Sequence, residues 1–441
     1  MVRSQYPRSA ELYARACKVL PGGNTRSSVF RSPHPLYAQH GEGSRLTDVD
    51  GIERIDFLNN YTSLIHGHRH PVIVEAVTKA LGHLTAVAMP TESEIELAEI
   101  LCERVPGFER VRFANSGTEA VMMAIKAARA FTGRPKIAKC EGAYHGSYDF
   151  AEVSTGPAPA AWGNDPHSLA YSDGTPPSVM KEVVVIPFND SAAAKRILTP
   201  HAKDLAGVIV DPMPNQAGLV PATNQFLSAI EDFCRESGAL MIFDEVVTFR
   251  LGYGGAQGDF GFRPDLTALA KVIGGGFPVG AVAGRADVMS VFDPSKGKPK
   301  VPHAGTFNAN PITMAAGAAA IRHLTRDRLS FINRLGDRAR GFLNEAFKTA
   351  GWPGQATGRG SLFRIHLTNA TLTDYRSAYQ APAEKQKLEI LLNFLLDNGF
   401  VISPIGVGNV STVMKDSDVE RMAETFLSGL RHLSSAPMAA E

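Results

Sequence analysis

The chain has 441 residues, enough for two or three packed regions or one large fold with an appended domain, and its 44% apolar and 20% charged residues are typical of a soluble globular enzyme. A formal net charge of +1 gives no support to nucleic acid or an anionic membrane as partner, and no apolar stretch reaches membrane-spanning length. The four cysteines are widely spaced without a CxxC pair, which favours reduced thiols and a cytoplasmic location over a disulfide framework.

Up to about residue 270 the sequence predicts helices and strands, which alternate from about Ser93 onward. Near the N-terminus, Leu12, Ala16 and Leu20 recur at helical spacing before Pro21, which favours an amphipathic helix over a transit peptide. A hairpin is expected over residues 41–57. Further on, the patterns predict helices over 95–105, 117–131 and 224–237, and strands over 111–113, 136–140, 183–187, 207–210, 239–243 and 266–270. Short apolar strands separated by helices predict a largely parallel sheet covered on both faces.

The remaining segments predict a long loop and a second domain. Residues 156–177 are rich in Pro, Gly, Ala and Ser, and a loop of that length inside a compact domain is usually a functional lid or poorly ordered. After about residue 330 the pattern changes to long helices, expected over 333–349 and 383–398, with a short strand over 363–367 between them. This pattern predicts a smaller α/β domain that the N-terminal segment joins.

Two charged residues at strand ends are the most informative feature. Lys271 follows the apolar run 266–270, and Asp244 follows the apolar run 239–243. A lysine at the end of a buried strand is costly unless it is neutral or covalently used, and a buried carboxylate needs a cationic or hydrogen-bonding partner. Pyridoxal phosphate satisfies both, because its aldehyde forms a Schiff base with lysine and its pyridinium nitrogen pairs with an acid.

Other residues fit the remaining parts of that cofactor. Ser116, Gly117 and Thr118 join a short strand to a long helix, where free amides and hydroxyls form an anion cradle. A plain N-cap would explain the same residues, but Lys271 downstream favours phosphate. Tyr144 is expected at the carboxyl end of the 136–140 strand, where it could stack on a ring or fill the core. Val246 points the same way as Asp244 in an extended chain and could contact the other ring face.

Taken together, these motifs resemble the fold-type I, class III pyridoxal-phosphate aminotransferases. The likeness is greatest to the branch with glutamate-1-semialdehyde 2,1-aminomutase and the β-amino-acid aminotransferases. It spans roughly residues 10–430 and rests on Pro21-Gly22-Gly23, Asp48-Val49-Asp50-Gly51, Gly67-His68-Arg69-His70-Pro71, Asn115-Ser116-Gly117-Thr118-Glu119-Ala120, Tyr144-His145-Gly146, Phe243-Asp244-Glu245-Val246, Lys271-Val272-Ile273-Gly274-Gly275-Gly276 and Gly305-Thr306-Phe307-Asn308.

The resemblance implies a fold and a set of roles. The fold would be α/β, with a large domain (76–325) around a mostly parallel seven-stranded sheet and a smaller α/β domain from both termini (1–75 and 326–441). Lys271 would be the Schiff-base lysine, Asp244 the partner of the pyridine nitrogen, Tyr144 and Val246 the ring contacts, and Ser116, Gly117 and Thr118 the phosphate loop. Thr306 is similar to a residue that reaches the phosphate from a second subunit, which implies a homodimer with shared sites. The family's Glu before Pro is here Asp211.

The resemblance also implies an activity. The enzyme would move an amino group from an amino acid, possibly a β-amino acid, or an amine to a keto acid. Arg26 corresponds to an arginine that grips the substrate carboxylate in β-amino-acid aminotransferases, although an exposed loop arginine is the plainer interpretation. The aminomutase is the main alternative, disfavoured because its Ala-Gly-Ser-Gly stretch is replaced by residues 153–157. An amino-acid racemase or epimerase uses the same parts.

Three other classes fit less well. A nicotinamide dehydrogenase needs GxGxxG, and the segment from Gly252 has Gln257 at its last position. His66, His68 and His70 alternate in a loop without supporting Cys or carboxylate ligands, which disfavours a metal site. A catalytically inactive binding protein is disfavoured because Lys271 and Asp244 are both present.

Overall fold

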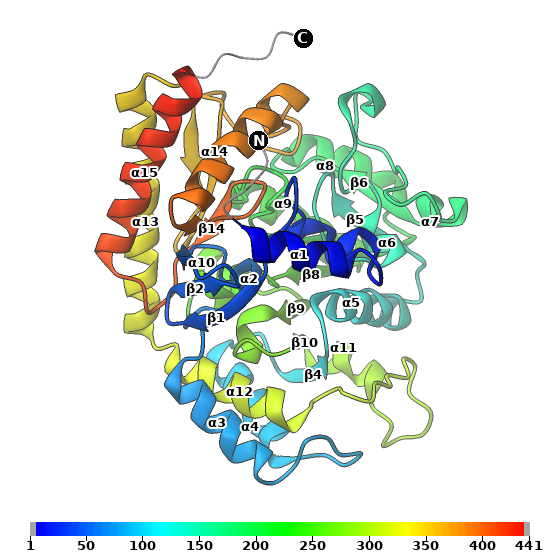
Figure 1. Ribbon diagram of the computed structural model, residues 1–441. Helices are drawn as coiled ribbons and strands as arrows, with labels where there is room; N and C mark the ends of the chain where they lie inside the picture. Colours follow the sequence, from blue (N-terminus) through cyan, green and yellow to red (C-terminus); the bar gives the residue numbers. More distant parts are fainter. Residues whose placement is uncertain (1–5, 436–441) are drawn as a thin grey trace. The chain divides into compact units, whose positions relative to one another are not determined.

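The computed structural model describes residues 6–435, which form two compact units (Figure 1). The larger unit consists of Pro71–Phe331 and Ala370–Tyr379, and the rest of the described chain forms the smaller unit. The sequence placed residues 370–379 in a C-terminal domain over 326–441, but in the structure they belong to the larger unit.

The larger unit contains the central sheet and the helices around it. Its strands are β4 (Arg110–Ala114), β5 (Lys136–Cys140), β6 (Val183–Ile186), β7 (Leu205–Val210), β8 (Leu240–Asp244), β9 (Leu266–Ala270) and β10 (Gly280–Gly284). Its helices are α3 (Pro71–Leu81), α4 (Glu92–Arg104), α5 (Gly117–Thr132), α6 (Asp149–Glu152), α7 (Pro177–Lys181), α8 (Ser191–Leu198), α9 (Asn224–Ser237), α10 (Gly255–Phe260), α11 (Ala286–Met289) and α12 (Pro311–His323). Short 3-10 turns are η3 (Pro159–Ala161), η4 (Thr199–His201), η5 (Thr248–Arg250), η6 (Lys271–Gly274) and η7 (Ser290–Phe292).

The seven-stranded sheet has the order β4-β10-β9-β8-β7-β5-β6. Strands β6, β5, β7, β8 and β9 are parallel, whereas β10 pairs antiparallel with both β9 and β4. The expected mostly parallel seven-stranded sheet is thus confirmed, although the sequence pattern did not single out β10. Its residues, Gly280–Gly284, are two glycines, two alanines and one valine, and glycine and alanine are uncommon in strands.

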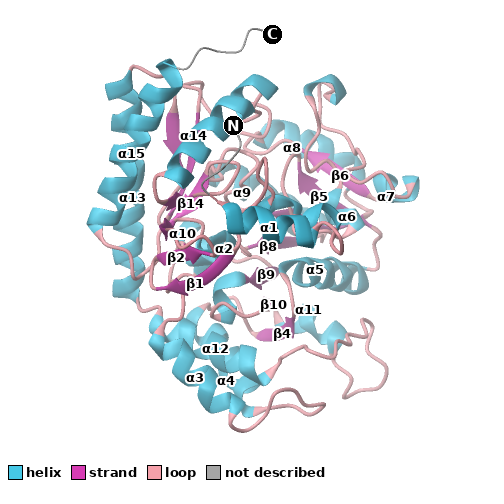
Figure 2. Cartoon of the chain, in the orientation of Figure 1, coloured by secondary structure: helices cyan, strands magenta, loops and turns pink. Residues whose placement is uncertain are grey.

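Both faces of this sheet are buried. Helix α5 packs against β7, β9 and β10, and Figure 2 shows it next to β9. Its Val121 and Ile125 share a core cluster with Ile242 and Ala268. Side chains that alternate with these along the strands, such as Phe243, point to the opposite face and are also buried. A sheet covered on both faces is typical of α/β folds, and it leaves the strand ends as the places where polar residues gather.

The smaller unit contains two further sheets. Its strands are β1 (Ala38–Glu42), β2 (Arg45–Asp48), β3 (Glu53–Asp56), β11 (Gln355–Thr357), β12 (Leu362–His366), β13 (Phe400–Val401) and β14 (Val407–Asn409). Its helical segments are α1 (Pro7–Ala16), η1 (Pro21–Gly23), η2 (Ser27–Val29), α2 (Asn59–Thr62), α14 (Pro382–Asp397) and α15 (Asp416–Ser435), and α13 (Arg326–Ala350) spans the boundary between the units. The expected hairpin is confirmed as β2 and β3, to which β1 adds a third strand. No helix within residues 6–435 is long and apolar enough to cross a bilayer.

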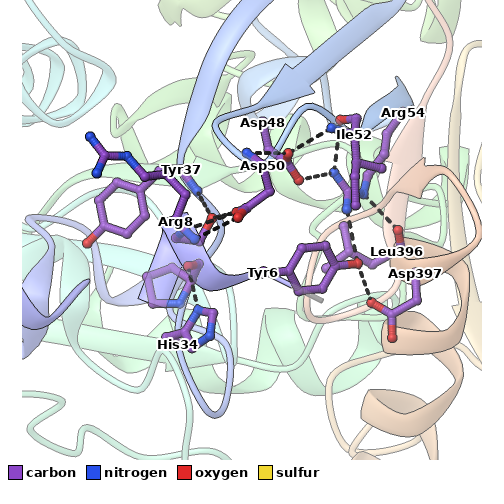
Figure 3. Close-up of polar contacts among 12 residues, drawn as sticks. Tyr6, Arg8, His34, Tyr37, Asp48, Asp50, Ile52, Arg54, Leu396 and Asp397 are labelled. Atoms are coloured by element: carbon purple, nitrogen blue, oxygen red, sulfur yellow. Dashed lines mark hydrogen bonds and ion pairs between the residues drawn. The ribbon is translucent and has the colours of Figure 1, made fainter. Parts of the chain in front are cut away.

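Within the smaller unit, buried polar contacts join the N-terminal segment to the C-terminal part of the chain (Figure 3). Arg54 on β3 donates hydrogen bonds to Asp48 Oδ2 at 2.6 Å, to the Leu396 carbonyl at 2.8 Å and to Tyr6 Oη at 3.1 Å. The Tyr6 hydroxyl in turn donates to Asp397 Oδ1 at 2.8 Å. Because a buried guanidinium is stable only when its donors are satisfied, this network fixes the start of α1 against the end of α14.

Candidate active site

The predicted catalytic residues lie at the carboxyl ends of neighbouring strands. Asp244 is the last residue of β8, and Lys271 directly follows β9, its parallel neighbour in the sheet. Asp211 directly follows β7, on the other side of β8. Since parallel neighbours end at the same edge of a sheet, the three charged residues gather at one edge of the larger unit.

Lys271 stands in a strained turn and is half-buried. Its φ of 53° lies in the left-handed region, which a lysine rarely adopts, and it begins the turn η6. Burial lowers the pKa of the Lys271 amine, Asp244 and Asp211 oppose this shift, and the Arg250 charge adds to it. A lowered pKa increases the neutral fraction of the amine, which is its nucleophilic form. Arg250 itself is fully buried in η5.

Asp244 is held by two hydrogen bonds. Its Oδ1 accepts from the Val246 amide at 3.0 Å, and its Oδ2 lies 2.8 Å from His145 Nδ1. Because a carboxylate accepts, Nδ1 carries the hydrogen and the neutral ring leaves Nε2 as an acceptor. Burial lowers the pKa of His145, although the Asp244 contact opposes that shift. His145 Nε2 is buried and has no hydrogen-bond partner among residues 6–435.

Asp211 is the second acid at this edge. Burial raises the pKa of Asp211 well above its usual range, and the nearby Asp244 raises it further. Its Oδ1 accepts a hydrogen bond from the Met213 amide at 2.9 Å, which opposes the shift. The raised pKa favours the neutral form of Asp211, which lessens its repulsion with the nearby Asp244.

The start of α5 lies at the same edge of the sheet. Gly280 on β10 pairs with Ala114, the last residue of β4, and with Ala270, the last residue of β9. Ser116 is the N-cap of α5, and its hydroxyl accepts from the Glu119 amide at 3.2 Å. The N-cap interpretation of Ser116 is therefore correct. It leaves the amides of the first helical residues without an intrahelical acceptor, so an anion can still bind there.

Close packing links this helix start to the other predicted residues. A Cβ at Gly117 would lie 3.1 Å from the Val246 side chain and 3.5 Å from the Ala270 side chain, so the start of α5 packs closely against both residues and a larger side chain would displace Val246. The Thr118 hydroxyl accepts from the Ser147 amide at 3.2 Å, which attaches the loop after β5 to the helix. Tyr144 belongs to that loop and exposes 53% of its surface, so its ring is available to a ligand.

The two remaining predicted residues are Thr306 and Arg26. Thr306 is exposed in the segment before α12, and that segment contacts the residues before α5 through Asn308, whose Oδ1 accepts from Asn115 Nδ2 at 2.7 Å. Arg26 belongs to the smaller unit, where its Nη1 donates to Asn60 Oδ1 at 3.1 Å.

Lys139 was not predicted as a site residue. It is fully buried in β5, and its Nζ donates to the carbonyls of Ala143 at 2.8 Å and Val153 at 2.6 Å and to Thr155 Oγ1 at 3.4 Å. Burial lowers the pKa of Lys139 to about 7. Its amine thus ties the residue before Tyr144 to the segment that opens the long loop. The sequence signal that could have identified Lys139 is a lysine inside the apolar strand 136–140.

We expect Lys139→Met to lower the free energy of unfolding by about 2–4 kcal/mol, because two buried carbonyls lose their donor at about 1–3 kcal/mol each. Chemical denaturation of the enzyme checks this. The matched control is Lys136→Met on the same strand, whose ion pair with Asp204 is 3.9 Å long and partly exposed. That change is expected to cost less than about 1 kcal/mol. Equal stability of the Lys139 variant and the parent would contradict the role of its amine.

These residues fit pyridoxal phosphate. A half-buried lysine whose amine has a lowered pKa and a buried carboxylate lie at the ends of adjacent strands, as the aldehyde and the ring nitrogen of the cofactor require. A helix start with free amides lies at the same edge, where phosphate groups bind. The buried His145 Nε2, which has no partner among residues 6–435, offers a polar atom to a bound group.

Comparisons with known proteins agree with this chemistry. A family model described as "Aminotransferase class-III" matches residues 28–425. The glutamate-1-semialdehyde 2,1-aminomutase of Methanothermobacter thermautotrophicus is 38% identical over 96% of this chain and 100% of its own. Among solved structures, an omega-transaminase from Sphaerobacter thermophilus is 50% identical with a TM-score of 0.94, covering 97% of this chain and 98% of the other. A β-phenylalanine aminotransferase from Variovorax paradoxus is 35% identical with a TM-score of 0.86, covering 96% and 93%.

The lysine, the acid and the helix start therefore occur in a chain whose relatives match it over nearly its whole length. The fold agrees as well, since the omega-transaminase structure matches 97% of this chain with a TM-score of 0.94. By sequence, fold and the residues gathered at the sheet edge, this chain belongs to the class III aminotransferases, a family of pyridoxal-phosphate-dependent enzymes.

Proposed function

We propose that the enzyme is an intermolecular aminotransferase that takes the amino group of a β-amino acid or a related amine and passes it to a keto acid. The observation that carries this choice is the 50% identity over 97% of the chain to an omega-transaminase. The 35% identical β-phenylalanine aminotransferase supports a β-amino acid as donor.

Lys271 and Asp244 are the proposed catalytic residues. When bound, pyridoxal phosphate supplies an aldehyde that condenses with amines and a ring that accepts the charge left on a neighbouring carbon. The Lys271 amine would hold the cofactor and, once freed by the donor, would take a proton from the donor carbon as general base and return it as general acid. The Asp244 carboxylate would keep the ring nitrogen protonated, which favours charge transfer into the ring.

The neighbouring residues would bind and orient the cofactor. The α5 start, with Ser116, Gly117 and Thr118, is proposed to hold the phosphate. Tyr144 and Val246 are proposed to contact the two faces of the ring. His145 would act through Asp244, since its hydrogen bond at 2.8 Å fixes the carboxylate in one orientation.

The aminomutase remains a second candidate because relatives with that name are 38% identical over 96% of the chain. The deciding experiment is visible absorbance of the enzyme with pyridoxal phosphate, before and after addition of single donors. A panel of α-amino acids, β-amino acids, an arylalkyl amine and glutamate-1-semialdehyde would be used. Loss of the lysine-linked band with a β-amino acid or amine, and its return with a keto acid, supports the proposal. A response only to glutamate-1-semialdehyde, yielding 5-aminolevulinate without an added acceptor, would overturn it.

Arg26 is proposed to bind the carboxylate of the donor. We expect Arg26→Ala to raise the KM for β-amino acids by about tenfold or more while changing the KM for a carboxylate-free amine by less than about twofold, because only the former loses an ion pair. Steady-state kinetics with both donors measure this, and Arg15→Ala, an exposed arginine of α1, serves as control. Equal effects on the two donors would remove Arg26 from the substrate site.

The active form is proposed to be a homodimer in which Thr306 reaches the phosphate of the partner subunit. Several large apolar side chains of the larger unit are exposed on α3, on α4 and on the segment between them: Val72, Val74, Leu81, Leu84, Val87, Met89 and Ile95. A cluster of this kind indicates a surface that another protein covers. Sedimentation equilibrium that gives the mass of one chain would contradict the shared-site dimer.

A further inference from the structure

Four consecutive residues of the smaller unit adopt the left-handed conformation. Asn59, Asn60, Tyr61 and Thr62 have φ values of 46°, 46°, 54° and 74°. Asparagine tolerates this region, but a tyrosine and a β-branched threonine do so only at a cost of about 1–2 kcal/mol each. Such strain persists only where the surroundings impose it, and it occurs mostly at functional sites.

The base of this turn is rigidly anchored. Asp56 Oδ1 accepts hydrogen bonds from the amides of Leu58 and Asn59, both at 2.9 Å. The Asn59 side chain donates to the Asn409 carbonyl at 3.2 Å, and Asn409 Nδ2 donates to the Leu58 carbonyl at 2.9 Å. Asn59 and Asn409 are fully buried. Buried hydrogen bonds on both sides therefore impose the left-handed path.

Asn60 and Tyr61, at the tip of the turn, both contact the guanidinium of Arg26. Asn60 Oδ1 accepts from Arg26 Nη1 at 3.1 Å, and Asn60 Nδ2 donates to Ser63 Oγ at 3.1 Å, which fixes the orientation of the amide. The Arg26 guanidinium carbon lies 5.9 Å from the centre of the Tyr61 ring, and the Tyr61 hydroxyl donates to the Ser28 carbonyl at 2.5 Å. The turn thus holds an acceptor and an aromatic face against Arg26.

These contacts leave one side of the guanidinium available. Arg26 uses Nη1 toward Asn60, while its Nε and Nη2 donate to no acceptor among residues 6–435. An arginine binds a carboxylate most strongly through two parallel N–H donors, and the Nε–Nη2 edge offers such a pair. An otherwise flexible side chain is therefore held with a carboxylate-binding edge open.

We propose that Asn60 is a positioning residue for donor specificity: the left-handed turn holds its amide so that Arg26 presents the Nε–Nη2 edge to the donor's carboxylate. This inference rests on the proposed role of Arg26. A preoriented guanidinium loses less side-chain entropy on binding than a free one. Asn60 would thereby increase the preference of the enzyme for donors that carry a carboxylate.

The test is Asn60→Gly in the holoenzyme, because glycine adopts the left-handed conformation without strain and removes only the amide. We expect the KM for a β-amino acid to rise about fivefold to tenfold, with kcat, melting temperature and the KM for a carboxylate-free amine unchanged within about twofold. Asn60→Asp keeps an acceptor at the same place and serves as the conservative variant, which is expected to retain the orientation of Arg26.

The double variant separates the two proposals. In an Arg26→Ala background, Asn60→Gly is expected to have no further effect on the β-amino acid. If Arg26→Ala changes donor preference and Asn60→Gly does not, the positioning role fails and the role of Arg26 stands. If Arg26→Ala leaves donor preference unchanged, both fail. An equal effect of Asn60→Gly in the parent and in the Arg26→Ala background would also overturn the inference.

Discussion

Lys271→Ala is expected to lower turnover by more than about 10⁴-fold, because one amine both links the cofactor and transfers the proton. The variant should still bind pyridoxal phosphate noncovalently, since the proposed phosphate site at α5 and the Asp244 carboxylate remain. Absorbance spectroscopy is expected to show bound cofactor without the lysine-linked band, and dialysis should release that cofactor faster than from the parent.

Lys271→Arg tests whether a positive charge at this position is enough for activity. It restores a cation at the same place, but a guanidinium does not condense with an aldehyde at neutral pH, so this variant should be as inactive as the alanine one. Lys181→Ala, an exposed lysine of the same unit, controls for general effects of lysine removal. Turnover near the parent level in Lys271→Ala would rule out the proposed mechanism.

The sheet and its edge could be predicted from the sequence because their signals are local. Apolar runs that end in Asp244 and Lys271 identify β8 and β9, and the glycines after Lys271 indicate the turn that follows. Helix α9 begins and ends where expected, since Thr223 caps its start and Gly238 its end. Parallel pairing then places the carboxyl ends of these strands together without further information.

The supporting contacts could not be predicted, because they join residues far apart in the chain. The bond between His145 and Asp244 spans 99 positions, and nothing near either residue indicates the other. Residues 370–379 were expected in the C-terminal domain, yet Arg376 binds Glu141 through Nε at 2.7 Å and Nη2 at 3.0 Å and so belongs to the larger unit. That contact attaches the segment to the loop that carries Tyr144.

The backbone preferences of the residues in the left-handed turn do not indicate the conformation that they adopt. Tyr61 and Thr62 favour extended backbone, so no sequence rule predicts φ values of 54° and 74° there. The local hydrogen bonds to Asp56 and the long-range bond from Asn409 together override that preference. Positions where local preference fails in this way are expected to be functional, which is why this turn and Arg26 belong to one argument.

Asp244→Asn is expected to lower turnover about 10³-fold, equivalent to about 4 kcal/mol in the barrier, because the amide cannot keep the ring nitrogen protonated. Its shape is nearly unchanged, so the fold should persist and the lysine-linked absorbance band should remain, in contrast to Lys271→Ala. The amide Nδ2 would meet the donor on His145 Nδ1 or the Val246 amide, so the imidazole is expected to change tautomer. Loss of the Asp244 charge also lowers the pKa of His145 further, since that contact raises it in the parent.

Asp211→Asn is the matched control, because Asp211 is a second acid at the same strand edge. Burial and the neighbouring Asp244 raise the pKa of Asp211, which favours its neutral form, and the amide has nearly the same shape and charge as that form. Its turnover should fall by less than about tenfold. If the two variants lost activity equally, Asp244 would not be the only acid needed to keep the ring nitrogen protonated. If Asp244→Asn retained parental turnover, the ring nitrogen would need no anionic partner, and the pairing of Lys271 with Asp244 would lose its catalytic meaning.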